Sequence, residues 1–172
     1  MSVWNGWYHV MIGMYGTWLP GDARGWRERD HKKHVPGDYR DPPPSGFGEA
    51  LHTYSKGAMV HDVTRLIASQ RRRVGERLVE KLCERGIQVL CVSVGAEHVH
   101  VLAKFPEARR VKIEVGHAKR AAALSSGGVG KLWSKGCAVK PINSRAHQLK
   151  TFDYIGAHAR KNNWIWTFRD PS

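Results

Sequence analysis

The stretch Ile87–Phe105, IQVLCVSVGAEHVHVLAKF, decides how the rest of the chain is organised. Two runs rich in apolar and β-branched residues, 87–94 and 98–105, are separated only by Gly95-Ala96-Glu97. Such a short connection predicts that the two runs pair as the antiparallel strands of a β-hairpin, which Pro106 ends. This hairpin is the centre from which the other elements are placed.

Outside the hairpin, the spacing of apolar residues changes between that of strands and that of helices. Runs at 7–15 and 132–142 predict two further strands. Apolar residues three and four positions apart predict helices at 58–85, 107–124 and 145–161. The last of these helices is expected to bury four apolar side chains, those of Leu149, Phe152, Ile155 and Ala159.

The order strand, helix, two strands, helix, strand and helix predicts the α+β class. We expect a ferredoxin-like sandwich, with an antiparallel four-stranded sheet and helices on one face. The aromatic tail 163–168 is compatible with a short added strand. Turn signals, such as Pro20-Gly21-Asp22, predict a long irregular insertion at about 18–48. A length of 172 residues suits a single domain over 1–172.

The composition limits the class of protein. With 41% hydrophobic and 25% charged residues, the chain is not intrinsically disordered, and no apolar stretch is long enough for a membrane span. The N-terminus lacks the features of a secretory signal, so a cytoplasmic location is the default expectation. The three cysteines form neither a disulfide framework nor a CxxC zinc pair.

The charge balance indicates a polyanionic partner. Lys and Arg number 28 against 15 Asp and Glu, a formal net charge of +13. Nucleic acid is the simplest such partner, although solvated basic residues alone can give the same excess. The charge does not distinguish single strands from duplexes, or DNA from RNA.

Two pairs of residues can carry chemistry. On a strand, His98 and His100 share one face, while Val99 between them points the other way. Tyr154 and His158 are four positions apart on the last helix, so they also share a face. Taken alone, the first pair is a weak metal signal, and the second fits the solvent side of an amphipathic helix.

Together the two pairs form a coherent site. His98, His100 and His158 would supply three nitrogen ligands to a divalent ion, which would polarise a phosphodiester. Tyr154 could then attack phosphorus and form a covalent phosphotyrosine. A phenol needs help to ionise near neutral pH, and Lys150 and Lys161 are close enough in helical position to supply it.

Four segments in this order are similar to those of a known family: Trp7–Tyr15 with Gly16–Asp22, the hairpin ending in His98–Leu102, Leu132-Trp133-Ser134, and Tyr154-Ile155. The chain resembles the single-tyrosine HUH transposases, the group with the type-200 insertion-sequence and REP-associated tyrosine transposases. The resemblance runs through most of the chain. Its most specific element is Glu97-His-Val-His-Val-Leu, which fits the pattern acidic residue, His, hydrophobic residue, His.

The resemblance implies cleavage and rejoining of single-stranded DNA, with recognition of a hairpin or palindrome at the ends. Tyr154 would be the nucleophile and form a 5′-phosphotyrosine, while His98 and His100 would bind Mg²⁺ or Mn²⁺. His158 stands where the family often has Gln as a third ligand. The resemblance further implies a homodimer, nucleoid association through DNA, and no membrane partner.

Seven basic residues are weaker candidates for DNA contacts, namely Arg71, Arg72, Arg73, Lys119, Arg120, Lys150 and Lys161. The triple arginine equally fits a solvated helix face. An inactive or domesticated binding protein for single-stranded nucleic acid is the alternative function, because basic charge and aromatic residues also suit that role.

Overall fold

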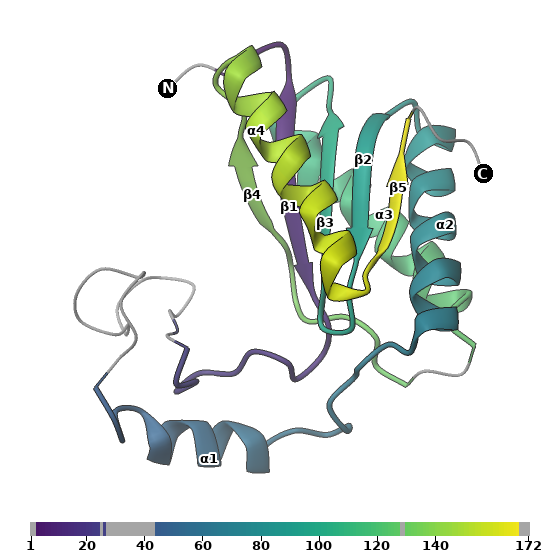
Figure 1. Cartoon of the computed structure of the whole chain (residues 1–172). Coiled ribbons are helices and arrows are strands. Elements are labelled where there is room, and N and C mark those ends of the chain that lie inside the picture. The colour runs from purple at the N-terminus through teal and green to yellow at the C-terminus, as the bar shows by residue number, and fades with distance from the viewer. Residues whose placement is uncertain (1–2, 25, 27–43, 128–129, 169–172) are drawn as a thin grey trace.

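The computed structural model describes residues 3–24, 26, 44–127 and 130–168 (Figure 1). The described strands form one antiparallel sheet in the order β4-β1-β3-β2-β5. The strands are β1 (Trp7–Gly13), β2 (Gln88–Val94), β3 (His98–Lys104), β4 (Ala138–Pro141) and β5 (Trp164–Thr167). The helices are α1 (Glu49–Gly57), α2 (Ala68–Glu84), α3 (Val111–Leu124) and α4 (Arg145–Gly156), with 3₁₀ helices η1 (Ala108–Arg110) and η2 (Ala157–Lys161). None of the described helices is long and apolar enough to cross a membrane.

The expected β2–β3 hairpin is confirmed and supplies two neighbouring strands of the sheet. Val99 pairs with Val94 and Val101 with Val92, and all four side chains are buried in the larger apolar core. Because side chains alternate along a strand, Leu102 belongs to a second apolar cluster on the other face. His98 and His100 share the parity of Leu102, so they project from that second face.

The helices cover both faces of the sheet, which corrects the expectation of helices on one face. In Figure 1, α2 and α3 lie behind the sheet, and α4 crosses its front. α2 packs against α3 and β2, whereas α4 contacts β2 and β3. The reason is that β1, β2 and β3 carry buried residues on both sides: Trp7, Cys91 and Leu102 form a separate cluster that Ile155 of α4 covers.

The sheet has five strands rather than four. The β-α-β-β-α-β order from β1 to β4 is confirmed, but the aromatic tail adds β5 at the free edge of β2. Trp164 and Trp166 are half-buried and pack against the larger core. β5 thus extends the sheet and shields one side of α2.

The region between β1 and α2 differs most from the sequence-based expectation. The helix expected from residue 58 begins at Ala68, because backbone N–H groups of the preceding segment bond to strand ends instead: Thr64 donates to Tyr15 and Leu66 to Ala96. α1 was not expected; it has only nine residues, and none of them is buried. In the expected insertion at 18–48, residues 18–24, 26 and 44–48 carry turns, and 25 and 27–43 lie outside the described residues.

The last helix is rotated relative to its apolar pattern. Ile155 is buried and Phe152 is half-buried, as expected, but Leu149 and Ala159 are exposed. The buried positions include three polar residues instead, Gln148, Thr151 and His158. The helix therefore turns a polar side toward the face of the sheet from which His98 and His100 project.

Gly75 provides a test of how β5 docks on α2. A Cβ at this buried glycine would lie 2.1 Å from Cζ3 of Trp164. We expect Gly75→Ala to displace Trp164 and lower the free energy of unfolding by about 1–3 kcal/mol, measured by urea denaturation. At Gly116 of α3 an added Cβ meets nothing within 4 Å, so Gly116→Ala should instead stabilise by about 0.5–1 kcal/mol. Equal stability of the two variants would contradict the docking.

Candidate metal and tyrosine site

The two histidines of β3 lie near the start of the strand, on the face that α4 covers. His100 is opposite Met11 of β1 and Ser93 of β2, and it is buried. His98 is opposite Gly13 and remains exposed. The two imidazole rings are 4.9 Å apart between centroids. The strand therefore holds one buried and one accessible imidazole side by side.

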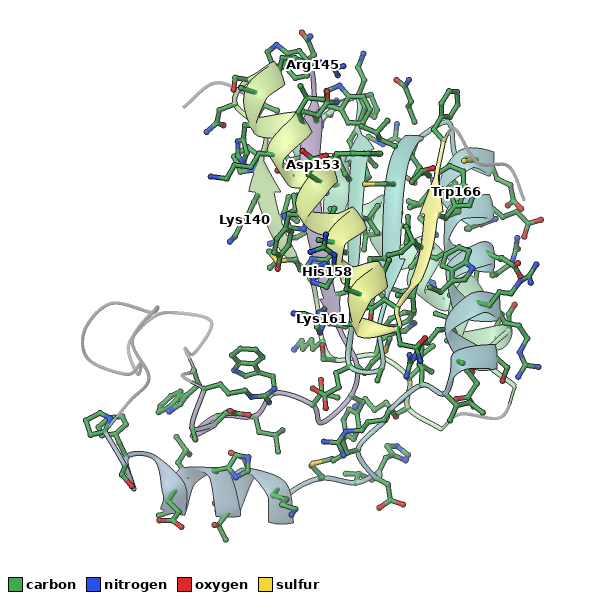
Figure 2. The ribbon with its side chains drawn as sticks, viewed as in Figure 1. Lys140, Arg145, Asp153, His158, Lys161 and Trp166 are labelled. Carbon is green, nitrogen blue, oxygen red and sulfur yellow. The ribbon has the colours of Figure 1, made fainter. Side chains whose placement is uncertain are left out.

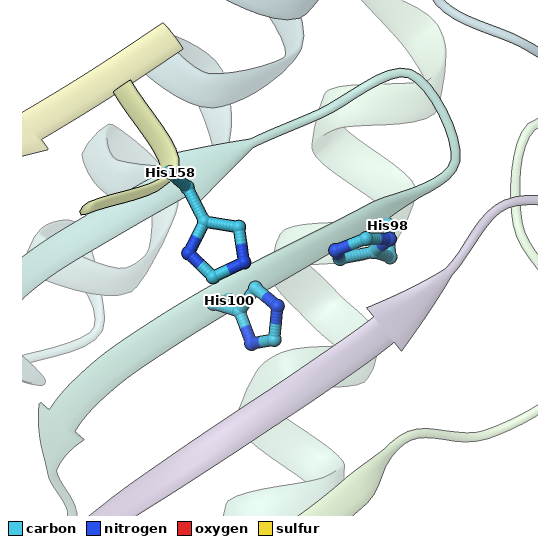
Figure 3. A group of neighbouring side chains, drawn as sticks. All are labelled: His98, His100 and His158. Carbon is cyan, nitrogen blue, oxygen red and sulfur yellow. The ribbon is translucent and has the colours of Figure 1, made fainter. Parts of the chain in front are cut away.

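The third imidazole comes from η2, which continues α4. His158 is buried, and its ring centroid is 4.8 Å from that of His100 and 6.1 Å from that of His98. One ligand nitrogen from each of the three side chains lies within 4.8 Å of the others (Figure 3). Three convergent nitrogens match the donor set that sequence analysis expected for a divalent ion.

Hydrogen bonds orient two of these rings toward a common point. His158 Nδ1 lies 2.9 Å from the carbonyl oxygen of Tyr154, so Nδ1 donates and Nε2 keeps its lone pair. His100 Nδ1 lies 2.9 Å from His9 Nε2. The other nitrogen of His100, Nε2, is buried and has no partner within the described residues. A buried nitrogen without a partner is costly unless it binds something, so the residues fit a metal ion.

Burial favours the neutral form of His9, His98 and His100, and a neutral imidazole is the form that binds metals. Desolvation, followed by the positive charge of Lys140, lowers the pKa of His9 from its ordinary 6.5 to about 4. Desolvation and the neighbouring His98 lower the pKa of His100 to about 3. The pKa of His98 is also lowered, first by desolvation and then by His158.

His9 is the residue that sequence reasoning missed. It lies on β1, is buried, and stacks on His100 with 5.1 Å between ring centroids. Alternation along the strand at 7–15 puts His9 on the face of Trp7 and Met11, but only the pairing of β1 with β3 places it beside His100. His9 touches the cluster chiefly through the His100 ring, with which it shares a hydrogen bond.

Tyr154 lies at the edge of the histidine cluster. Its side chain is 52% exposed, which leaves the phenol open to solvent. The ring centroid is 4.8 Å from His158 and 5.6 Å from His100, and 6.2 Å from His9. The structure thus brings Tyr154 and the three expected ligands together within one chain.

The basic candidates divide into two groups. Lys161 is the last residue of η2, its charge acts on His98 and His100, and it lies below His158 in Figure 2. Lys150 is exposed on α4. The others lie on α2 and α3, the helices behind the sheet. One of these, Lys119, has a structural role: its ammonium donates hydrogen bonds to the carbonyl oxygens of Ser134 and Gly136.

The arginines of α2 also have partners. Arg71 donates to the carbonyl oxygens of Leu66 and Asn162, and Arg72 pairs with Glu76. Arg73 and Arg120 are exposed, and Arg120 contacts His117. Of the seven basic candidates, only Lys161 has an electrostatic effect on the histidine cluster within the described part of the chain.

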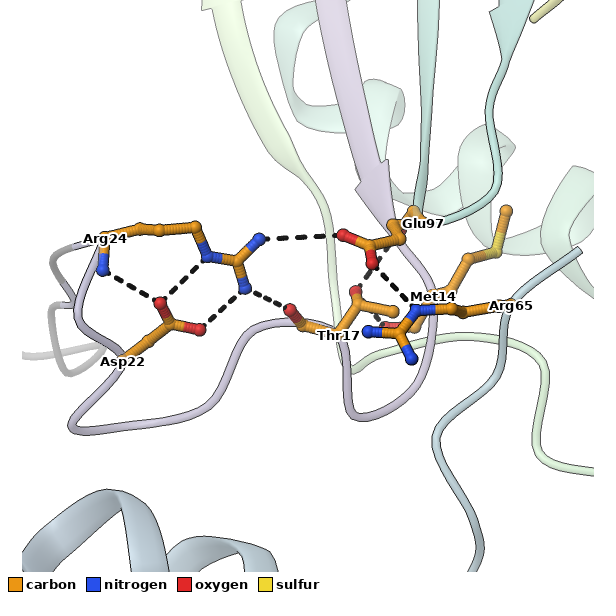
Figure 4. Close-up of polar contacts among 6 residues, drawn as sticks. All are labelled: Met14, Thr17, Asp22, Arg24, Arg65 and Glu97. Carbon is orange, nitrogen blue, oxygen red and sulfur yellow. Dashed lines mark hydrogen bonds and ion pairs between the residues drawn. The ribbon is translucent and has the colours of Figure 1, made fainter. Parts of the chain in front are cut away.

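A polar cluster fixes the start of β3 next to His98 (Figure 4). The Glu97 carboxylate accepts from Nε of Arg65 at 2.9 Å and lies 3.6 Å from Arg24. Arg24 also pairs with Asp22 at 2.6 Å and donates to the carbonyl of Thr17. The first part of the insertion and the segment after it are thereby tied to the residue that precedes the first histidine.

The neutral histidines make stability depend on pH in a defined direction. Below pH 6.5 the unfolded chain protonates these imidazoles, whereas the folded chain resists protonation down to about pH 4 at His9 and about pH 3 at His100. In metal-free buffer, the free energy of unfolding should therefore fall as the pH drops from about 6.5 to about 4. The double variant His9→Gln/His100→Gln should flatten this dependence. His61→Gln/His117→Gln should not, and an unchanged profile in the first variant would contradict the assignment.

Metal affinity tests the role of His9. When His100 Nε2 binds an ion, its Nδ1 carries the proton and donates to His9 Nε2. We expect His9→Leu to weaken Mn²⁺ binding by about 10–100-fold in calorimetric titration, because the His100 ring loses that orienting acceptor. His9→Gln retains an acceptor and should bind more tightly than His9→Leu, and His117→Leu should match the unaltered protein. Full affinity in His9→Leu would refute the role.

Comparison with known proteins supports the fold. No protein-family model and no curated protein sequence matches the chain. Among solved structures, the chain is similar to a REP-associated tyrosine transposase bound to a REP hairpin. The match covers 94% of this chain and 74% of that one, with a TM-score of 0.55 and 12% sequence identity. At this identity the likeness concerns the fold, so the fold of this chain is similar to that of a tyrosine transposase.

Proposed function

We propose that this protein is a metal-dependent endonuclease and strand transferase of single-stranded DNA, of the HUH tyrosine transposase type. The observation that carries the proposal is the packing of Tyr154 against His100 and His158 in one chain, beside a buried His100 nitrogen that has no partner in the described region. The fold similarity to a REP-associated tyrosine transposase supports it. A water-using hydrolase would need the histidines but would not need a tyrosine at this position.

The residues have distinct roles in the proposed reaction. His98, His100 and His158 hold Mg²⁺ or Mn²⁺, which supplies Lewis-acid polarisation of the phosphate when bound. The Tyr154 oxygen forms a bond to phosphorus, and the bond from phosphorus to the 3′ oxygen breaks. The phenolic proton leaves to water, which reaches the half-exposed side chain, and the departing 3′ oxygen takes up a proton. The product is a 5′-phosphotyrosine and a free 3′-OH.

Rejoining reverses the same step. A second 3′-OH attacks the phosphotyrosine, which restores the phenol and a continuous strand, so no nucleotide energy source is required. Lys161, whose charge reaches the cluster, is suited to stabilising the phenolate or a nearby phosphate. Lys150 has no contact that connects it to the tyrosine in the described structure, and its role stays a prediction.

The substrate of the proposed reaction is a strand with a hairpin or palindrome near the cleavage point. The similar solved structure is bound to a REP hairpin, and the net charge of +13 suits any such polyanion. We further propose a homodimer in which each chain carries a complete site, since Tyr154 and the three histidines already meet within one chain.

The covalent intermediate gives the direct test. The protein is incubated with end-labelled single-stranded oligonucleotides, including hairpin-bearing ones, and Mn²⁺ or Mg²⁺. We expect a protein–DNA adduct that survives denaturing electrophoresis and that disappears with EDTA. Tyr154→Phe should lose the adduct below detection, because no phenolic oxygen remains to bond to phosphorus.

Controls separate catalysis from binding. Tyr54→Phe removes an exposed hydroxyl from α1 and should form the adduct normally. His98→Ala should abolish the adduct while retaining oligonucleotide binding in a mobility-shift assay. An adduct that persists in Tyr154→Phe would overturn the nucleophile. Binding without any adduct in the unaltered protein would favour the alternative, a non-catalytic protein that binds single-stranded nucleic acid.

A further inference from the structure

A cavity of about 670 Å³ opens beside the start of β3. It is lined by the segment between α1 and α2, by Gln70 of α2, and by Gly130 and Lys131. Arg65 is part of the lining and pairs with Glu97, the residue before His98. The Arg65–Glu97 ion pair therefore connects the cavity lining to the residue that precedes His98 (Figure 4).

Hydrogen bonds to the core hold the two sides of this cavity in place. Thr64 donates its backbone N–H to the carbonyl of Tyr15 at 2.9 Å and its hydroxyl to the carbonyl of Lys131 at 2.9 Å. Tyr15 in turn donates to Leu132 at 3.0 Å. Both walls are thus anchored where β1 ends, and Thr64 is buried between them. The cavity is a built feature of the fold rather than a gap between loose segments.

Three basic side chains line the cavity. Lys56, Arg65 and Lys131 carry positive charge there, and Asp62 is the one acid among the described lining residues. The ammonium of Lys131 lies 4.6 Å from the ring centroid of Tyr15. Neither Lys56 nor Lys131 forms an ion pair with another described residue. Their charges are available to an anionic ligand.

The lining also offers apolar and ring surface. Val60 is 84% exposed although it is apolar, and Met59 and Val63 lie beside it in the lining. His61 adds an exposed imidazole that packs edge-on against Tyr15, with 5.9 Å between ring centroids. A ligand that combines a phosphate with a flat base would be complementary to both parts. The volume falls in the range of small-ligand pockets.

We propose that this cavity binds a nucleotide of the DNA strand outside the scissile phosphate, with its phosphate at Lys56 and Lys131 and its base against Val60 and His61. The inference rests on the proposed function, because it places the cavity on the path of the strand that Tyr154 cleaves. Arg65 links the two sites: its ion pair with Glu97 holds the cavity wall at a fixed position relative to His98. The cavity thereby fixes the register of the strand at the tyrosine.

The test measures how the affinity for labelled oligo(dT) depends on salt, by fluorescence anisotropy. Lys56→Gln/Lys131→Gln removes both cations that would neutralise this one phosphate, so the slope of log affinity against log salt should become shallower by about 0.7. Lys104→Gln/Lys112→Gln removes equal charge from exposed positions at the other end of β3 and on α3, and should leave the slope unchanged.

A second variant tests the cavity without removing any contact of the fold. Val60→Glu places a carboxylate in the cavity at a highly exposed position and should weaken binding at least as much as the lysine pair does. Ile113→Glu, at a position of α3 that is 56% exposed, is its matched control. Melting temperatures of all variants verify that they are folded.

The outcomes distinguish a failure of the cavity inference from a failure of the proposed function. If the unaltered protein binds oligo(dT) and forms the adduct but the cavity variants match their controls, the cavity inference is wrong and the proposed function stands. If the unaltered protein neither binds single strands nor forms the adduct, both fall. Weaker binding and a shallower slope confined to the cavity variants support the inference.

Discussion

The alternation of side chains along β3 is the constraint on which the rest of the molecule depends. One parity of this strand, with Val99 and Val101, is buried in the core beneath α2 and α3. The other parity, with His98 and His100, is thereby forced onto the opposite face. A slip of one residue in the register would bury the imidazoles in the larger apolar core and move the valines to the face that α4 covers, so the same packing that stabilises the sheet also fixes the position of the site.

The second requirement is a helix that presents polar residues toward a sheet. α4 covers apolar residues of the sheet with Ile155 and turns Tyr154 toward the two histidines, and η2, which continues α4, does the same with His158. The Nδ1 hydrogen bond from His158 to the Tyr154 carbonyl links the proposed ligand and the proposed nucleophile within one turn of chain. Placing the two halves of the site on separate elements makes the site depend on the folded sheet as a whole.

Sequence reasoning predicted the elements that carry strong local patterns. The hairpin, its two histidines and the β-α-β-β-α-β order all follow from strand alternation and helical spacing. Sequence reasoning was less successful where tertiary contacts determine the position of a residue or the orientation of a helix. The position of His9 beside His100 follows only from the β1–β3 register. The apolar pattern of α4 is too weak to predict which side of the helix faces the sheet. α1 buries no residue, so core packing does not identify it. The Arg24–Glu97–Arg65 cluster joins residues far apart in sequence, which no local pattern shows.

The proposed function requires that His98, His100 and His158 together bind one divalent ion beside Tyr154. The most direct measurement is an anomalous difference map from crystals of the protein soaked in Mn²⁺. We predict a single strong peak within coordination distance of His98, His100 and His158, adjacent to the Tyr154 ring. A map with no peak at this cluster under saturating Mn²⁺, or with peaks only elsewhere, would contradict the account.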